Sequence, residues 1–218
     1  MSSSRPRPSR RDFVGQVALL GAAAAVPVET AIASAPDGAW DLAWVARVAK
    51  ARDRAVFDMP AIGDGTMLDM ATRYLDNCDA VYGAGKASAV AVLNVRTRAV
   101  ALALDDARWE RYALGAEYEE KDKGTQQPAT RNPYLDVPAG AYPGTGAIRP
   151  LVQRGAILLV CDFALGHLAN RLATKAGKAA DEVHRDLLAG FVPGAFSVPS
   201  GIFGMAKAQN AGCALVKL

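Results

Sequence analysis

The stretch GAILLVC, residues 155–161, is a continuous apolar run with the length of a β-strand. A second run of the same kind, SAVAVLNV, occupies residues 88–95. Strands that are apolar on both faces are typical of parallel sheets covered by helices, whereas a strand with one solvated face alternates between apolar and polar residues. The two runs therefore predict the central strands of a parallel sheet.

Strand-like and helix-like stretches alternate on both sides of these runs. Further short strands are predicted at residues 54–59, 194–198 and 213–217. Apolar residues at three- and four-residue steps predict helices at residues 41–50, 67–81, 98–114, 163–175, 180–188 and 202–210. This alternation predicts an α/β fold whose parallel or mostly parallel sheet has helices on both faces.

Residues 115–150 interrupt the alternation. They show no sustained period and hold several glycines together with Pro128, Pro133, Pro138, Pro143 and Pro150. An unpatterned insert of about 35 residues inside a compact domain is either functional or poorly ordered. We expect residues 34–52 to form a linker and a short N-terminal helix, and residues 53–218 to form one domain that carries the insert.

The first 33 residues have the order of regions found in a signal peptide. Arginines among residues 5–11 precede an apolar run at 13–28, and Ala31-Ile32-Ala33 matches an A-x-A cleavage site. The run is shorter than the roughly 20 residues of a membrane-spanning helix, although an uncleaved anchor is the alternative. Residues 9–14, SRRDFV, resemble the twin-arginine consensus, which implies that the Tat translocase exports the folded chain, for example to the periplasm.

Charge and cysteine content narrow the class of protein. The chain has 25 basic and 22 acidic residues; residues 1–33 hold four arginines and two acids, which leaves 21 basic against 20 acidic residues. No basic stripe indicates a nucleic-acid partner. Cys78, Cys161 and Cys213 lie far apart, and with only His167 and His184 beside them no metal-ligand spacing arises, so neither a metal nor a cofactor is indicated. In an oxidising compartment an odd cysteine leaves at least one thiol unpaired.

Several motifs in the second half of the chain occur in an order typical of one family. Asp186-Leu-Leu-Ala-Gly190 is followed by Val198-Pro-Ser-Gly201 and by Gln209-Asn-Ala-Gly212 before the last predicted strand. Earlier, DDARWERY at residues 105–112 follows the apolar stretch 91–104. From about Arg54 to the C-terminus the chain resembles the DsrE-like (DsrE/DsrF, YchN-like) proteins, and in particular their exported branch.

This resemblance implies a three-layer α/β/α domain with a five-stranded, mostly parallel sheet, often assembled into trimers or hexamers. It also implies a role for Cys161, because a cysteine after the third core strand carries sulfur as a persulfide in such proteins. Many relatives have an asparagine close after that cysteine, whereas Asp162 follows it here. A carboxylate beside the sulfur opposes formation of the thiolate.

The candidate site lies where ligands bind in open α/β sheets, outside the carboxyl ends of the strands. Cys161 ends a predicted strand directly before a helix, and amide groups at a helix N-terminus stabilise anions such as a thiolate. The alternative is an inert, buried cysteine. Residues expected to bind an anion beside it, or simply to form a solvated rim and a helix cap, are Asn94, Arg96, Arg98, Ser200 and Gly201.

Other chemically notable side chains have structural interpretations. We expect His167 to point away from the sulfur and His184 to lie on a solvated face. Trp109 and Tyr112 are expected in the core or in a subunit interface. Cys78 lies on the apolar stripe of its predicted helix and Cys213 begins the last predicted strand, so we expect both in the core.

Two functions follow from this sequence. The first is an exported small-ligand-binding or assembly module, which forms a homo-oligomer and whose cysteine is inert. The second is a sulfur-transfer or redox protein that takes a small sulfur species or anion and carries a persulfide on Cys161.

Overall fold

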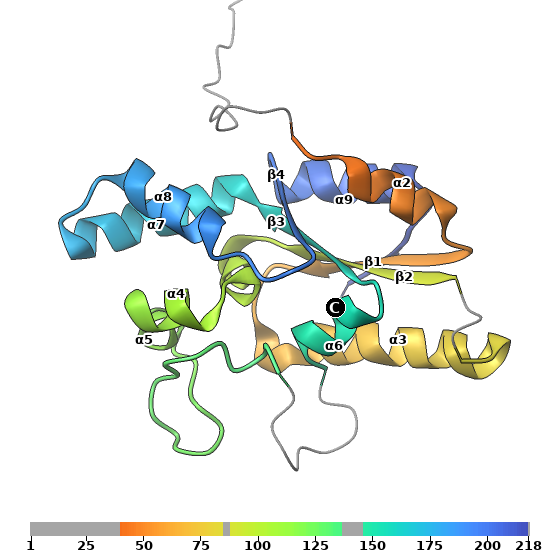
Figure 1. The fold of residues 1–218 in the computed structure, drawn as a ribbon, viewed down its shortest axis with the longest axis horizontal. Coiled ribbons are helices and arrows are strands. Elements are labelled where there is room, and N and C mark those ends of the chain that lie inside the picture. The colour runs from red at the N-terminus through yellow and green to blue at the C-terminus, as the bar shows by residue number, and fades with distance from the viewer. Residues whose placement is uncertain (1–39, 85–87, 137–145, 218) are drawn as a thin grey trace, which may run out of the picture. The chain divides into compact units, whose positions relative to one another are not determined.

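The computed structural model describes residues 40–84, 88–136 and 146–217. The predicted signal peptide at 1–33, the first residues of the linker and residues 137–145 of the insert lie outside this range. Five parallel strands form one sheet in the order β4-β3-β2-β1-β5 (Figure 1). They are β1 (Asp53–Met59), β2 (Ala89–Val95), β3 (Ile157–Cys161), β4 (Ala195–Val198) and β5 (Ala214–Val216). The predicted α/β fold class is confirmed.

Helices occupy most of the chain between the strands. The α-helices are α2 (Ala43–Lys50), α3 (Thr66–Tyr82), α4 (Asp106–Arg111), α5 (Leu114–Tyr118), α6 (Ile148–Gln153), α7 (Asp162–Ala176), α8 (Ala180–Ala189) and α9 (Gly201–Asn210). Two 3-10 helices, η1 (Gly63–Gly65) and η2 (Thr97–Ala103), follow β1 and β2. In the described part of the chain no helix combines the length and apolarity needed to cross a membrane.

The two runs that predict central strands do form the middle of the sheet. β2 and β3 pair in parallel from Val92 opposite Ile157 to Val95 opposite Val160. Every residue of β3 is buried, and so is every residue of β2 after Ala89. The edge strands β4 and β5 are shorter and more exposed than the two central strands.

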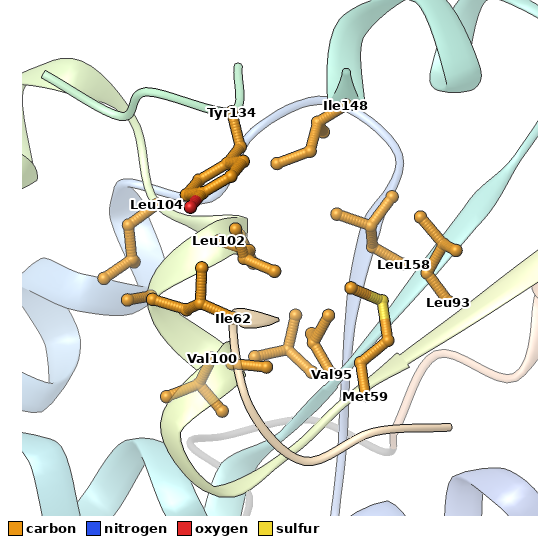
Figure 2. Packing of buried hydrophobic residues seen from close by; sticks show 14 of the residues in the cluster. Met59, Ile62, Leu93, Val95, Val100, Leu102, Leu104, Tyr134, Ile148 and Leu158 are labelled. Carbon is orange, nitrogen blue, oxygen red and sulfur yellow. The ribbon is translucent and has the colours of Figure 1, made fainter. Parts of the chain in front are cut away.

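Two apolar clusters fill the two sides of the sheet and make it a three-layer α/β/α structure. Figure 1 shows α2 and α9 along one face, and α3 with α6 along the other. The smaller cluster joins α2 and α9 to the sheet. The larger one joins α3, η2, α7, α8 and the insert to the opposite face. Figure 2 shows Tyr134 and Ile148 of the insert gathered with Leu102 and Leu104 next to Leu158 of β3.

The prediction of a single helix at residues 98–114 is wrong. The chain instead forms η2, α4 and the start of α5, with a break at Leu104, whose backbone is extended (φ −98°, ψ 143°). Leu104 forms an isolated antiparallel bridge with Phe191, and Asp105 caps α4 by accepting the Arg108 N–H at 2.9 Å. A partner distant in sequence and a local cap thus override the helical periodicity.

The described part of the insert is folded onto the domain, so it is not an unpatterned loop. Asn132 is buried, and its Nδ2 donates to the carbonyl oxygens of Leu102 and Leu104, both at 2.9 Å. The insert also ends in a helix, α6, which the sequence pattern did not predict. Pro150 lies in its first turn, where the missing N–H has no helical partner to lose.

Close packing of the insert predicts a strong effect of one small substitution. A Cβ added to Gly115 would lie 2.2 Å from the carbonyl oxygen and 2.4 Å from the nitrogen of Ala129. Because these atoms are backbone, Gly115→Ala is expected to lower the free energy of unfolding by about 2 kcal/mol or more. Urea denaturation followed by circular dichroism measures this change.

The matched control is Gly166→Ala in α7, where the added Cβ meets no atom within 4 Å. This variant is expected to be as stable as the wild type or more stable by about 0.5–1 kcal/mol, because alanine favours the helix. Equal stability of the two variants would show that the backbone of Ala129 does not pack against Gly115 as described.

Candidate functional site

A cleft of about 420 Å³ lies at the carboxyl edge of the sheet. Three segments line it, and each of them follows a strand: the residues after β2, the start of α7 after β3, and the start of α9 after β4. The lining residues are Arg96, Thr97, Arg98, Cys161, Phe163, Ala164, His167, Arg171, Ser200, Gly201 and Ile202. The cleft therefore brings together Cys161 and four of the five binding residues expected from the sequence.

Cys161 is both the last residue of β3 and the N-cap of α7, with no loop between the two elements. It is 6% exposed, and its Sγ accepts the backbone N–H of Ala164 at 3.4 Å. This is the position in which a capping side chain satisfies a free amide of the first helical turn. A thiolate here would gain from the same amide and from the helix dipole. Cys161 is thus buried, but it is buried within the cleft.

Asp162, the carboxylate next to the sulfur, is paired with a histidine. Its side chain is 7% exposed and its Oδ1 lies 3.0 Å from Nε2 of His184 on α8, while Ser197 Oγ donates to the same oxygen at 3.4 Å. The expectation that His184 lies on a solvated face is therefore wrong. The hydrogen bond to Asp162 raises the pKa of His184 above its ordinary value. When His184 is protonated, its charge offsets the negative charge that Asp162 places beside Cys161.

Arg96 forms one wall of the cleft and is held by an ion pair. Its Nε and Nη2 donate to the two carboxylate oxygens of Asp58 at 2.7 and 2.8 Å. This bidentate contact keeps the pKa of Asp58 below its usual value. A Cβ on Gly201 would lie 2.8 Å from the Cβ of Arg96, so the start of α9 can approach this wall only with glycine at position 201. The adjacent Ser200 caps α9, since its Oγ accepts the Phe203 N–H at 3.2 Å.

Arg98 contributes a charge that no carboxylate of the described residues offsets. Its Nη2 donates to the carbonyl oxygen of Tyr118 at 3.3 Å, and its guanidinium lies 5.2 Å from the centre of the Tyr118 ring. Among the described residues no carboxylate lies within ion-pair distance of it. Arg171, by contrast, donates to Glu117 at 3.0 Å. Glu117 also accepts from Lys175, so it is shared by two cations. Of the three cleft arginines, Arg98 is the one without a carboxylate partner in the described ranges.

Asn94 is the expected binding residue that the structure leaves outside the cleft lining. It is fully buried, and its Nδ2 donates to Asp58 Oδ1 at 3.3 Å. Side chains alternate along a strand, so Asn94 points towards α9, where its Oδ1 lies 3.3 Å from the position of a Cβ on Gly204. Asn94 donates to Asp58, and Asp58 in turn accepts from Arg96, so Asn94 helps to position the arginine that forms the cleft wall.

Part of the cleft wall on α7 was not predicted from the sequence. His167, which was expected to point away from the sulfur, lines the same cleft as Cys161. Its ring meets Phe163 edge to face, with ring centres 4.6 Å apart. Ala164, His167 and Arg171 recur at steps of three and four residues, which places them on one helical face and is the signal that could have identified them.

The other cysteines and aromatic residues lie where the sequence predicts. Cys78 and Cys213 are buried, and all three cysteines, each within a described segment, are free. Burial raises the pKa of Cys78, and raises that of Cys213 to about 11, which disfavours their thiolates. Trp109 is fully buried. Tyr112 is partly buried and donates its hydroxyl to Asp186 at 2.8 Å.

No group of three or more His, Cys, Asp or Glu side chains suited to holding a metal ion occurs in the described ranges. A second hollow of about 590 Å³ lies over the insert, and it is lined by residues of mixed charge between Asp106 and Asp136. Searches with the whole chain against protein-family models, curated proteins and solved structures find no match.

The contact between His184 and Asp162 predicts a pH dependence of stability. A group whose pKa is raised on folding contributes stability that is fully present below its unfolded pKa, about 6.5 for histidine, and is lost as the pH rises through the folded value. Relative to His184→Gln, the wild type is therefore expected to lose about 1 kcal/mol of unfolding free energy between about pH 6 and about pH 9. Urea denaturation at a series of pH values measures the difference.

His167→Gln serves as the control, because His167 is exposed and its replacement leaves the pair between His184 and Asp162 intact. This variant should keep the pH dependence of the wild type. If His184→Gln kept it as well, the pair would not be the titrating group.

Proposed function

We propose that this chain is an exported DsrE-like protein that binds a small sulfur-bearing anion in the cleft and carries sulfur as a persulfide on Cys161. One observation supports this most directly: the Cys161 sulfur accepts an amide N–H at the start of α7 inside a cleft that contains the uncompensated Arg98. The described residues that line this cleft include three arginines and no carboxylate.

The cleft offers separate groups for the anion and for the nucleophile. Arg98 and the amide groups at the start of α9 favour negative charge near the mouth. The amide of Ala164 and the N-terminus of α7 favour the thiolate of Cys161, which is the form that attacks sulfur. A protonated His184 offsets the opposing charge of Asp162.

The sulfur-transfer step balances without an external oxidant. The Cys161 thiolate attacks the outer sulfur of thiosulfate, a new S–S bond forms, and the bond between the two thiosulfate sulfurs breaks. Its electron pair leaves with sulfite, and the persulfide anion remains on the cysteine. The charge is the same on both sides, and the persulfide occupies the place of the thiolate beside the Ala164 amide.

The second candidate is a binding or assembly module whose cysteine is inert, and a different observation favours it. Phe163 and Ile202, at the mouth of the cleft, are 66% and 76% exposed. Exposed apolar side chains gathered at one place are typical of ligand or subunit contacts. In this alternative the chain forms a homo-oligomer, as DsrE-like proteins often do, after the Tat translocase has exported it to the periplasm.

Thiosulfate treatment distinguishes the two candidates. The purified protein is incubated with thiosulfate, the thiols are trapped with an alkylating reagent, and peptides are analysed by mass spectrometry. We expect Cys161 to gain the mass of one sulfur atom, because it is the thiol that lines the cleft. Arg98→Gln should reduce the yield by about tenfold, since a guanidinium contact to an anion contributes on the order of 1.5 kcal/mol.

Cys78→Ser and Cys213→Ser are the matched controls, because both thiols are buried outside the cleft lining. Both variants should retain the persulfide, and Cys161→Ser should lose it. Absence of added sulfur at Cys161 in the folded wild type would favour the binding module.

A further inference from the structure

The cleft has more apolar wall than a small inorganic ion can cover. Most of its exposed lining surface is apolar, and Phe163, Ala164 and Ile202 are among the residues that line it. Phe163 and Ile202 remain largely exposed in the chain by itself. Covering such side chains with an apolar group is favourable by about 25 cal/mol per Å² of buried surface. The walls therefore favour a ligand with an apolar body.

The size of the cleft supports the same conclusion. Its volume of about 420 Å³ falls within the range of roughly 300–1,000 Å³ that is typical of pockets for organic ligands. A water molecule takes about 30 Å³ of liquid volume. Thiosulfate or sulfate would therefore leave most of the cleft filled with water and the apolar walls wet.

The charges limit the ligand to a small anionic group. Arg96 is engaged by both carboxylate oxygens of Asp58, and Arg171 shares the carboxylate of Glu117 with Lys175. Arg98 remains as the cleft arginine without a carboxylate partner among the described residues. One guanidinium, with the amides at the starts of two helices, matches a single anionic head group.

We propose that the ligand of this cleft is an organic monoanion, with an alkyl or aryl body against Phe163 and Ile202 and a sulfur-containing anionic head group at Arg98. The site is that of the proposed function, and the inference deepens it by naming the class of sulfur donor: an organic thiosulfonate in place of inorganic thiosulfate. The apolar body on this donor is what the walls of α7 and α9 recognise.

The transfer from such a donor also balances. The Cys161 thiolate attacks the terminal sulfur of the thiosulfonate, an S–S bond forms to the cysteine, and the bond between the two donor sulfurs breaks. Its electron pair leaves on an organic sulfinate. Two negative charges are present before and after the step, and no proton or oxidant is needed.

Binding is tested separately from chemistry by using Cys161→Ser and ligands that carry no transferable sulfur. Titration calorimetry compares naphthalene-2-sulfonate and benzenesulfonate with sulfate. We expect naphthalene-2-sulfonate to bind at least about tenfold more tightly than sulfate, with benzenesulfonate between them. Ile202→Ser should remove most of this preference, and Arg98→Gln should weaken binding of every ligand by about tenfold.

Two further substitutions are matched controls. Val81→Ser replaces another apolar side chain that is largely exposed, 72%, but lies outside the cleft. Arg185→Gln removes an exposed arginine that does not line the cleft. Neither should change the affinity for naphthalene-2-sulfonate. Equal affinity for sulfate and the aryl sulfonates, or an equal effect of Ile202→Ser and Val81→Ser, would overturn the proposal.

The outcome for the ligand class is distinguishable from the outcome for sulfur transfer. The wild type is treated in parallel with thiosulfate and with benzenethiosulfonate, and persulfide on Cys161 is measured by mass spectrometry. Aryl-sulfonate binding without persulfide from either donor would remove the sulfur-transfer function and leave the ligand class standing. Persulfide formation at equal rates from both donors, without an aryl preference in binding, would overturn the ligand class alone.

Discussion

The parallel pairing of β2 with β3 is the constraint on which the rest of the structure depends. Both strands are buried on both faces, so helices must cover each side of the sheet. Because all five strands run parallel, the segments that leave β2, β3 and β4 emerge at one edge. Cys161 reaches this edge as the last residue of β3 and begins α7 without an intervening loop. The cleft is thus a consequence of strand direction.

Ion pairs at the carboxyl edge of the sheet determine which ligands the cleft can bind. Arg96 is fixed by Asp58, and Gly201 allows α9 to pack against the aliphatic part of its side chain. Asp162 is hydrogen-bonded to His184 on another helix, and this contact raises the pKa of His184. When His184 is protonated, its charge offsets that of Asp162. What remains is a net positive cleft with apolar walls and one thiol. This combination favours an anionic ligand and a nucleophilic cysteine.

Features set by local pattern could be predicted from the sequence, whereas features set by distant partners could not. The apolar runs at 88–95 and 155–161 indicated buried strands, and the strand ends indicated that Cys161, Arg96 and Ser200 share an edge. The break at Leu104 depends on Phe191, and the pairing of His184 depends on Asp162, 22 residues away. Asn94 faces α9 on the same side of the chain as Arg96, but it lies two residues further from the strand end, next to Gly204, and is therefore buried outside the cleft.

The central claim is that Cys161 is the thiol presented to the cleft. The most direct measurement is the rate at which each thiol of the native protein reacts with iodoacetamide, followed by peptide mass spectrometry. All three thiols are buried to a similar extent, but Cys161 is the one that lines the cleft. We therefore predict that Cys161 is alkylated first, and that Cys78 and Cys213, which lie outside the cleft lining, react only when the protein unfolds. Alkylation of Cys161 only on unfolding, at the same rate as the two core cysteines, would contradict it.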